Sequence, residues 1–212
     1  MIEIHEDNYS FDVCPRNYRR AILNMLIQLK PKYCLEIGTH LYQTSKVFGY
    51  YFEKYEPEGK LITVDIADWK VENPFPKYIT EIIVYPYDLD IEKRHGNLEV
   101  YYQDWKETVS AWKNKLSEIN WLKIYVPMKK LKILPNRFDF AFIDGDHSEY
   151  AIKEDLRMAK DMVNDNGYIL IDDIEDSGHE QMNYYQNYLK PKNPSFYEMA
   201  GMALIKAGDL QL

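Results

Sequence analysis

Apolar and polar residues along this chain follow two alternating patterns, one typical of buried strands and one typical of amphipathic helices. Short apolar runs predict strands at residues 33–38, 60–68, 97–104, 138–146, 168–174 and 200–208. Apolar residues at helical spacing predict helices at residues 17–30, 44–55, 105–119, 148–163 and 179–189, with a turn at 164–167. Strands that alternate with helices predict an α/β fold, with a mostly parallel central sheet and helices on both of its faces.

The chain has 212 residues, of which 46% are hydrophobic, and this suits a globular domain with a full core. It contains no internal repeat and no Gly/Ser-rich linker, so we expect one domain over residues 1–212, with an N-terminal helical segment (1–30) and a catalytic core (31–212). The acidic first ten residues do not match a signal peptide, and no apolar run is long enough for a membrane span. Cys14 and Cys34 match neither a metal motif nor a disulfide framework, which favours a reducing, cytoplasmic location.

The formal net charge is −8, which argues against general nucleic-acid binding because phosphate neutralisation needs clustered Lys and Arg. Residues 122–137 form one basic stretch, which we interpret as a solvated face or a lid in preference to a site for an anionic substrate. The expected partner is a small-molecule acceptor, with no nucleic acid and no membrane. The sequence leaves the oligomeric state open, a homo-oligomer being one option.

The predicted strands share one chemical feature, because nearly all of them end in carboxylates. These residues are Glu36, Asp65, Asp68, Asp104, Asp144, Asp146, Asp172 and Asp173. A single Asp in this position, such as Asp146, is explained as the N-cap of the following helix. Five strands in turn are not explained that way, since crowded carboxylates repel one another unless a cation or a hydroxyl-rich ligand compensates. In a parallel sheet this edge is where ligands bind.

The segment "FDFAFIDGDHSEYAIKEDLRMAKDMVNDNGYILIDDI" resembles the class I S-adenosylmethionine-dependent methyltransferases. It is most similar to the metal-dependent catechol-type and macrolide-sugar O-methyltransferases, and the resemblance extends over residues 33–173. It implies a Rossmann-like methyltransferase fold and an enzyme that uses S-adenosylmethionine. It further implies O-methylation of a small hydroxylated acceptor, of sugar or phenol type, with Mg²⁺ as the assisting metal.

The resemblance also implies roles for individual residues. The cofactor-binding positions are Glu36, Gly38, Thr39, Thr44, Ser45, Asp65, Asp104 and Trp105, and the metal-binding positions are Asp144, Asp172 and Asp173. His147 is a candidate general base, because a neutral imidazole accepts a proton near pH 7. A helix-start or supporting role for His147 is the competing interpretation, and Asp144 is the alternative base.

The loop after the first strand departs from the pattern of the family. Gly38 is retained, but His40 and Tyr42 stand where further glycines are expected, and glycine serves there for positive φ or close approach. Three interpretations compete: a working loop on a shifted path, binding that is weak or needs a partner, and a decayed site on a scaffold. The row of strand-end acids favours the first.

Three other functions remain as alternatives. A nicotinamide-dependent Rossmann enzyme would share the strand-one glycine and the strand-two acid, but the chain lacks G-x-G-x-x-G, and such an enzyme would not account for Asp172 and Asp173. A degenerate methyltransferase fold would act as a non-catalytic binding module. A metal-independent methyltransferase would keep the cofactor and be insensitive to chelators.

Overall fold

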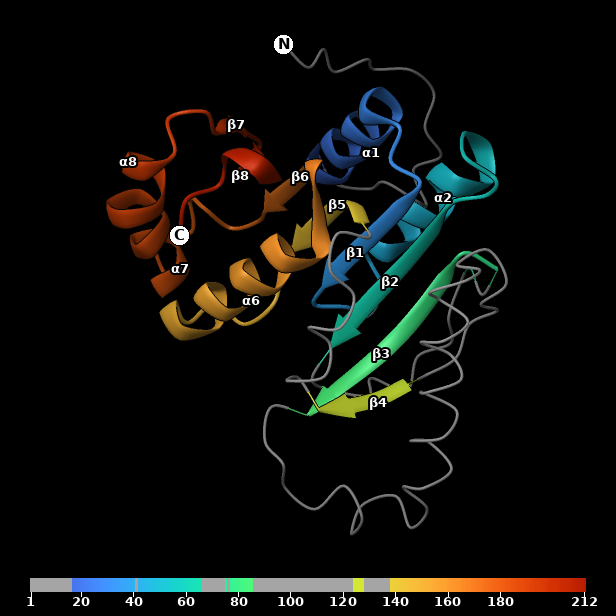
Figure 1. Cartoon of the computed structure of the whole chain (residues 1–212), viewed down its shortest axis with the longest axis horizontal. Coiled ribbons are helices and arrows are strands. Elements are labelled where there is room, and N and C mark those ends of the chain that lie inside the picture. Colours follow the sequence, from blue (N-terminus) through green and yellow to red (C-terminus); the bar gives the residue numbers. More distant parts are fainter. Residues whose placement is uncertain (1–16, 41, 66–74, 76, 86–123, 128–137) are drawn as a thin grey trace, which may run out of the picture.

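The computed structural model describes residues 17–40, 42–65, 75, 77–85, 124–127 and 138–212 (Figure 1). Its strands are β1 (Tyr33–Ile37), β2 (Lys60–Asp65), β3 (Ile79–Tyr85), β4 (Ile124–Pro127), β5 (Phe138–Ile143), β6 (Val163–Ile171), β7 (Tyr197–Met199) and β8 (Met202–Lys206). The strand and helix predicted at 97–104 and 105–119, and with them Asp104 and Trp105, lie outside the described residues, as does Asp68.

The strands form one sheet in the order β4-β3-β2-β1-β5-β6-β8-β7. The six strands from β4 to β6 pair in parallel, and β8 pairs antiparallel with both β6 and β7. The strand order reverses direction between β1 and β5, which is the switch point where ligands bind in such sheets. The predicted mostly parallel sheet is therefore confirmed.

Successive side chains of the central strands pack on opposite faces of the sheet, because the side-chain period of a strand is two residues. In β1, Leu35 and Ile37 belong to one hydrophobic cluster while Cys34 belongs to the other. In β5, Ala141 belongs to the same cluster as Leu35, and Phe142 belongs to the same cluster as Cys34. The sheet thus has two cores, which explains why these strands are apolar throughout.

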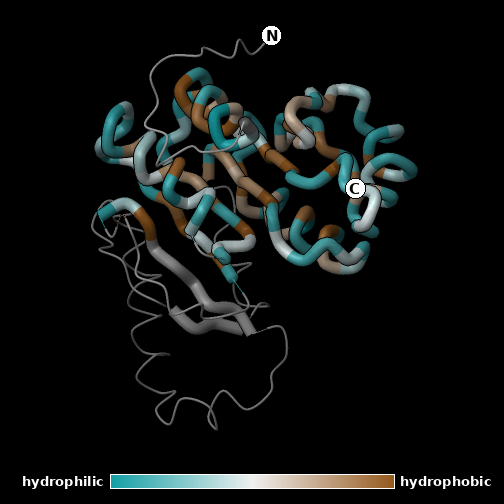
Figure 2. The backbone as a smooth tube through the Cα atoms, turned by 180° about the vertical axis from the view of Figure 1, so that it is seen from behind, coloured by the Kyte–Doolittle hydropathy of each residue, from teal (hydrophilic) through white to brown (hydrophobic). Residues whose placement is uncertain are grey.

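The helices cover the two faces. Helices α1 (Asn17–Leu29) and α2 (Ser45–Lys54) contact each other on one face. Helices α6 (Glu149–Met162) and α7 (Glu180–Tyr184) lie on the other, where α7 continues as a π-helical turn (Tyr185–Leu189) and α8 (Lys190–Lys192). A 3₁₀ turn (Ala207–Asp209) follows β8. Both α1 and α6 carry hydrophobic and hydrophilic residues along their turns (Figure 2), as expected for helices with one buried face.

The structure corrects the predicted elements in two respects. Strands β3 (Ile79–Tyr85) and β4 (Ile124–Pro127) lie in stretches for which no strand was predicted, and β7 is also additional. Residues 164–167 are not a separate turn but a bulge within β6, because Phe138 pairs with Val163 whereas Phe140 pairs with Tyr168. The bulge stays beside β5 because Asn164 Nδ2 donates to Asp139 Oδ1 at 3.2 Å.

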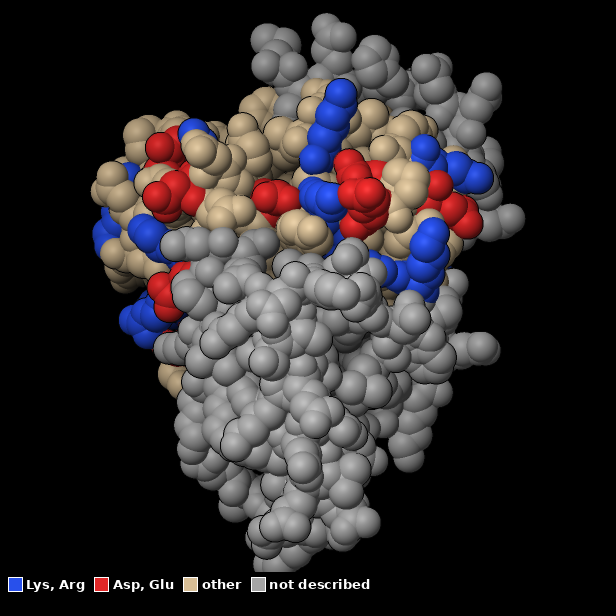
Figure 3. All heavy atoms as spheres, turned by 45° about the vertical axis from the view of Figure 1, so that its right-hand side comes forward, with Lys and Arg blue, Asp and Glu red and all other residues tan. Residues whose placement is uncertain are grey.

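On the face shown in Figure 3, acidic and basic side chains of the described residues are interspersed. Within the described part of the chain, no helix combines the length and the apolar character needed to cross a bilayer.

Candidate active site

A cavity of about 400 Å³ opens at the carboxyl ends of β1, β5 and β6. It is lined by Tyr18, Gly38, Thr39, His40, Gln43, Thr44, Asp144, Asp172, Asp173, Glu175, Asp176, Ala200 and Gly201. The position agrees with the rule for ligand sites in open α/β sheets. Several of the carboxylates predicted from the strand ends therefore meet in one place.

Gly38 brings the ends of β1, β2 and β5 together. Its φ is +97°, and its N–H donates to the carbonyl oxygen of Val64 at 2.7 Å. A Cβ at this position would lie 1.9 Å from the carbonyl oxygen of Asp144. Only glycine combines this φ with so close an approach of two backbones, so the one glycine that the loop retains is at the position that needs it most.

His40 and Tyr42 both adopt the left-handed conformation, with φ of 44° and 57°. The loop therefore has positive φ at the positions where the family pattern suggested glycine. The left-handed conformation costs a non-glycine residue about 1–2 kcal/mol. For Tyr42, whose side chain is 1% exposed in the core against α1 and α2, burial of the ring is worth at least as much and offsets this cost.

Asp65, at the end of β2, holds the same loop. Its Oδ2 accepts hydrogen bonds from the backbone N–H groups of Thr39 (2.9 Å) and His40 (2.8 Å). A carboxylate that accepts two backbone N–H groups is fixed in orientation, and it retains further acceptor capacity. Asp65 thus couples the loop to the second strand.

Glu36 and Ser45 lie below the cavity and do not line it. Glu36 is fully buried, and Ser45 Oγ donates to its Oε2, while its Oε1 has no hydrogen-bond partner in the structure. Burial raises the pKa of Glu36 to about 8, against the opposing effect of the hydrogen bonds from Ser45 and Thr63. At neutral pH Glu36 is therefore a largely protonated side chain that supports the loop, whereas Thr44 faces the cavity.

Asp144, Asp172 and Asp173 stand together at the ends of β5 and β6. Burial, followed by repulsion from Asp172, Asp173 and Glu36, raises the pKa of Asp144 to about 8. Burial and the neighbouring Asp173 raise the pKa of Asp172 to about 7. Asp173 adopts a φ of 51°, and its N–H donates to Asp172 Oδ1 at 2.9 Å. Burial is the main cause of both shifts, and the neighbouring carboxylates add to it.

Two histidines stand beside this group. His147 follows β5 and His179 precedes α7, and their rings stack with centroids 4.0 Å apart and an interplanar angle of 1°. Gln181 holds the segments together: its N–H donates to the carbonyl oxygen of His147 (2.9 Å), and its Nε2 donates to that of Asp172. His147 contacts Asp173 but does not line the cavity.

Helix α1 contributes residues that the sequence pattern did not single out. Tyr18 and Gln43 line the cavity, and Arg19 touches both of them. Arg19 is 5% exposed, its Nε donates to Tyr18 Oη at 3.1 Å, and its Nη2 donates to Gln43 Oε1. Its positive charge partly opposes the rise in the pKa of Asp144 that burial and the neighbouring carboxylates cause. The sequence pattern gave only apolar residues at helical spacing for this helix and carried no signal for Arg19.

The helix after β5 starts one step later than predicted. Its N-cap is Ser148, whose side chain accepts from the N–H of Ala151 at 3.2 Å. Asp146, which was interpreted as the cap, instead accepts the N–H of Ser148 at 2.8 Å. Hydrogen bonds from the side chain and then the backbone of Ser148 lower the pKa of Asp146. Asp146 therefore stabilises the turn before the helix and does not line the cavity.

Comparison with known proteins gives a family and a fold. A family model described as a methyltransferase domain matches residues 35–174. No curated protein sequence matches the chain at a significant level. Two solved structures illustrate the fold. One, from Staphylococcus aureus and assigned as a caffeoyl-CoA O-methyltransferase, is 14% identical, with 93% of this chain and 91% of that chain covered and a TM-score of 0.50. The other, CalS11, a TDP-rhamnose 3'-O-methyltransferase of calicheamicin biosynthesis, is 11% identical, with 94% and 84% covered and a TM-score of 0.52.

These matches confirm the predicted Rossmann-like methyltransferase fold. The matched segment begins in β1 and ends just after Asp173, so it contains the loop, the strand-end acids and His147. At such low identities the two solved structures bear on the fold alone.

Proposed function

This chain belongs to the methyltransferase domain family, and we propose that it transfers the methyl group of S-adenosylmethionine to a hydroxyl oxygen of a small acceptor, assisted by a divalent cation. The observation that carries the proposal is the gathering of Asp144, Asp172 and Asp173 with the glycine loop around one cavity. The acceptor is of sugar or phenol type. The structures of CalS11 and of the Staphylococcus aureus protein, whose names describe O-methyltransferases, are consistent with that choice.

The loop after β1 and the end of β2 would hold the cofactor. The amides of Thr39 and His40 fix Asp65, whose remaining acceptor capacity suits the ribose hydroxyls. S-adenosylmethionine, when bound, supplies a methyl group on a positively charged sulfur. Gly38 permits the close backbone approach, and Thr39 and Thr44 face the cavity with hydroxyl groups.

Arg19 suits the amino-acid end of the cofactor. It is a buried cation whose side chain donates to Tyr18 Oη and Gln43 Oε1, two neutral oxygens on the cavity wall. A carboxylate ligand would form a charge-assisted hydrogen bond with this guanidinium group. We therefore assign Arg19 to the carboxylate of the methionine part.

Asp144, Asp172 and Asp173 fit a hard divalent cation such as Mg²⁺, which takes carboxylate oxygens and retains waters. The fit rests on the chemistry of the donor set, because the three carboxylates line one cavity and supply only oxygen ligands. Mg²⁺ would polarise and orient the acceptor hydroxyl. His147 and Asp144 are the two candidates to accept the hydroxyl proton as the methyl group is transferred.

The first test is calorimetric titration with S-adenosylmethionine and S-adenosylhomocysteine, with Mg²⁺ and with EDTA. We expect binding in both conditions, weakened about 10- to 100-fold in Asp65→Asn, the range for loss of a charged hydrogen bond. Arg19→Met should weaken binding by at least about 10-fold, whereas its neighbour on the same helix, Arg20→Met, serves as the matched control and should bind normally.

The outcomes separate the competing functions. No binding in any condition would refute the proposal and favour a non-catalytic binding module. Binding followed by methyl transfer that is unchanged in EDTA would favour a metal-independent methyltransferase. Methyl transfer that EDTA abolishes and Mg²⁺ restores would support all parts of the proposal.

A further inference from the structure

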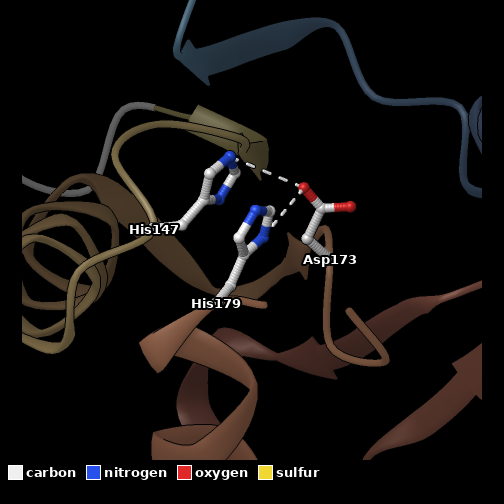
Figure 4. A group of neighbouring side chains, drawn as sticks. All are labelled: His147, Asp173 and His179. Atoms are coloured by element: carbon white, nitrogen blue, oxygen red, sulfur yellow. Dashed lines mark ion pairs between the residues drawn. The ribbon is translucent and has the colours of Figure 1, made fainter. Parts of the chain in front are cut away.

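His147, His179 and Asp173 form a second group of metal-ligand side chains, on segments that follow β5 and β6 and precede α7 (Figure 4). We propose that these three residues bind a borderline divalent transition-metal ion, such as Zn²⁺ or Co²⁺. This group differs from the all-carboxylate set proposed for Mg²⁺ and shares only Asp173 with it. Binding here does not depend on the proposed methyl transfer.

The distances suit a shared ion better than direct hydrogen bonds. Asp173 Oδ2 lies 3.6 Å from His147 Nε2 and 3.7 Å from His179 Nδ1, and one ligand atom from each of the three residues lies within 4.8 Å of the others. Hydrogen bonds between nitrogen and oxygen are shorter, about 2.7–3.2 Å. Two ligands that each lie about 2.0–2.1 Å from one tetrahedral ion are separated by about 3.4 Å. The observed gaps are close to this separation, and because each nitrogen lone pair lies in its ring plane, the two parallel rings must turn out of their stack to share an ion.

One of the two ligand nitrogens lacks a partner. His179 Nδ1, the atom that faces Asp173, is buried and has no hydrogen-bond partner among the residues that the structure describes. The two imidazoles lie parallel at 4.0 Å, so their nitrogens cannot bond to each other. An unpaired buried polar nitrogen is unfavourable, and a metal ion that accepts its lone pair removes that penalty.

The carboxylate of Asp176 lies next to His179, near the ring nitrogen that does not face Asp173. Asp176 Oδ2 lies 3.7 Å from His179 Nε2, on the side of the ring opposite to the metal-facing nitrogen. Metal-bound histidines commonly donate their other N–H to a carboxylate, which orients the ring. Asp176 is placed for that role after a small movement.

The ligand types select the metal. Imidazole nitrogen favours Zn²⁺, Co²⁺ and similar ions over Mg²⁺, which prefers an all-oxygen shell. Three protein ligands leave at least one position for water or substrate. The side chains of His147 and His179 are 32% and 28% exposed, so an ion can reach them from solvent. With His147 Nε2 bound to a metal, proton transfer would fall to Asp144.

The test uses the full chain, freed of metal by chelation and then titrated with Co²⁺ and Zn²⁺. We expect one ion per chain and a Co²⁺ absorption spectrum with nitrogen ligands. His179→Gln and His147→Gln should each weaken binding by more than about 100-fold, and Asp176→Asn by about 10-fold, since outer partners contribute about 10- to 100-fold. His40→Gln, which removes an imidazole from the cavity wall but not from this group, should leave the affinity unchanged. Thermal unfolding of each variant checks that the fold is retained.

A comparison of two variants separates this proposal from the Mg²⁺ site. Asp144→Asn should lose Mg²⁺ and keep Co²⁺, whereas His179→Gln should lose Co²⁺ and keep Mg²⁺. Equal Co²⁺ affinity in the wild type, His147→Gln and His179→Gln would overturn the proposal, as would the absence of Co²⁺ and Zn²⁺ binding in the wild type. Neither result would bear on S-adenosylmethionine binding.

Discussion

Replacement of Glu36 by glutamine should change how the stability of the protein depends on pH. Glu36 is fully buried, and its pKa of about 8 in the folded chain compares with an ordinary value of 4.5. Between these two values the unfolded chain has released the proton and the folded chain still holds it. Folding stability contributed by this group is therefore complete below pH 4.5 and decreases as the pH rises toward 8.

The pKa difference sets the size of the effect. A pKa shift of this size corresponds to a contribution of about 5 kcal/mol to the free energy of unfolding. Roughly 3 kcal/mol of this contribution is lost as the pH rises from 5 to 8. Glutamine keeps an oxygen that can accept from Ser45 and has no proton to lose. The free energy of unfolding of Glu36→Gln, relative to wild type, should therefore rise by roughly 3 kcal/mol over this range.

Urea unfolding of both proteins in EDTA, at several pH values from 5 to 8, measures this difference. Burial also raises the pKa of Asp144, Asp155 and Asp172, but these groups are present in both proteins and largely cancel in the comparison. A difference between the two proteins that stays constant with pH would refute the reasoning, since it would mean that Glu36 is ionised in the folded chain at neutral pH.

Three further substitutions test the loop at the cavity and the opposite end of the central strands. Gly38→Ala should lower the free energy of unfolding by more than about 3 kcal/mol, because its Cβ would meet the Asp144 carbonyl oxygen at 1.9 Å. Gly201→Ala, also at positive φ but with no atom within 4 Å, should cost only about 1–2 kcal/mol, and equal losses in thermal unfolding would contradict the steric argument. Asp139→Ala should cost about 2–4 kcal/mol, because Asp139 Oδ2 accepts two backbone N–H groups at the start of β1, while calorimetry should find S-adenosylmethionine affinity unchanged.

Hydrophobic patterning was sufficient to predict the sheet, because a strand covered on both faces must be apolar throughout. β1, β2, β5, β6 and β8 were all predicted in this way. β3, β4 and β7 were missed, although the β3 sequence ITEIIVY is rich in β-branched residues. The bulge in β6 was interpreted as a turn because Asn and Gly dominate it. Such a bulge depends on pairing with β5, which is a contact between distant parts of the chain.

The chemistry of the strand ends was also visible in the sequence. Parallel strands have their carboxyl ends at one edge of the sheet, and so acids at the ends of β5 and β6 were expected to meet there, as Asp144 and Asp172 do. The direction of each side chain was not considered in that argument. Glu36 has the same parity in β1 as Cys34, which faces α1 and α2, and it therefore points into the core toward Ser45.

The sequence by itself determined the fold class, the edge of the sheet that carries the site and the acids gathered there, because these follow from periodicity and strand direction. Only the tertiary structure decided which neighbours those residues receive. It stacks His179 on His147, 32 positions away, and brings Arg19 of α1 against Gln43 of the loop. Such pairs arise from the packing of separate elements across the sheet, and local sequence patterns carry no information about that packing.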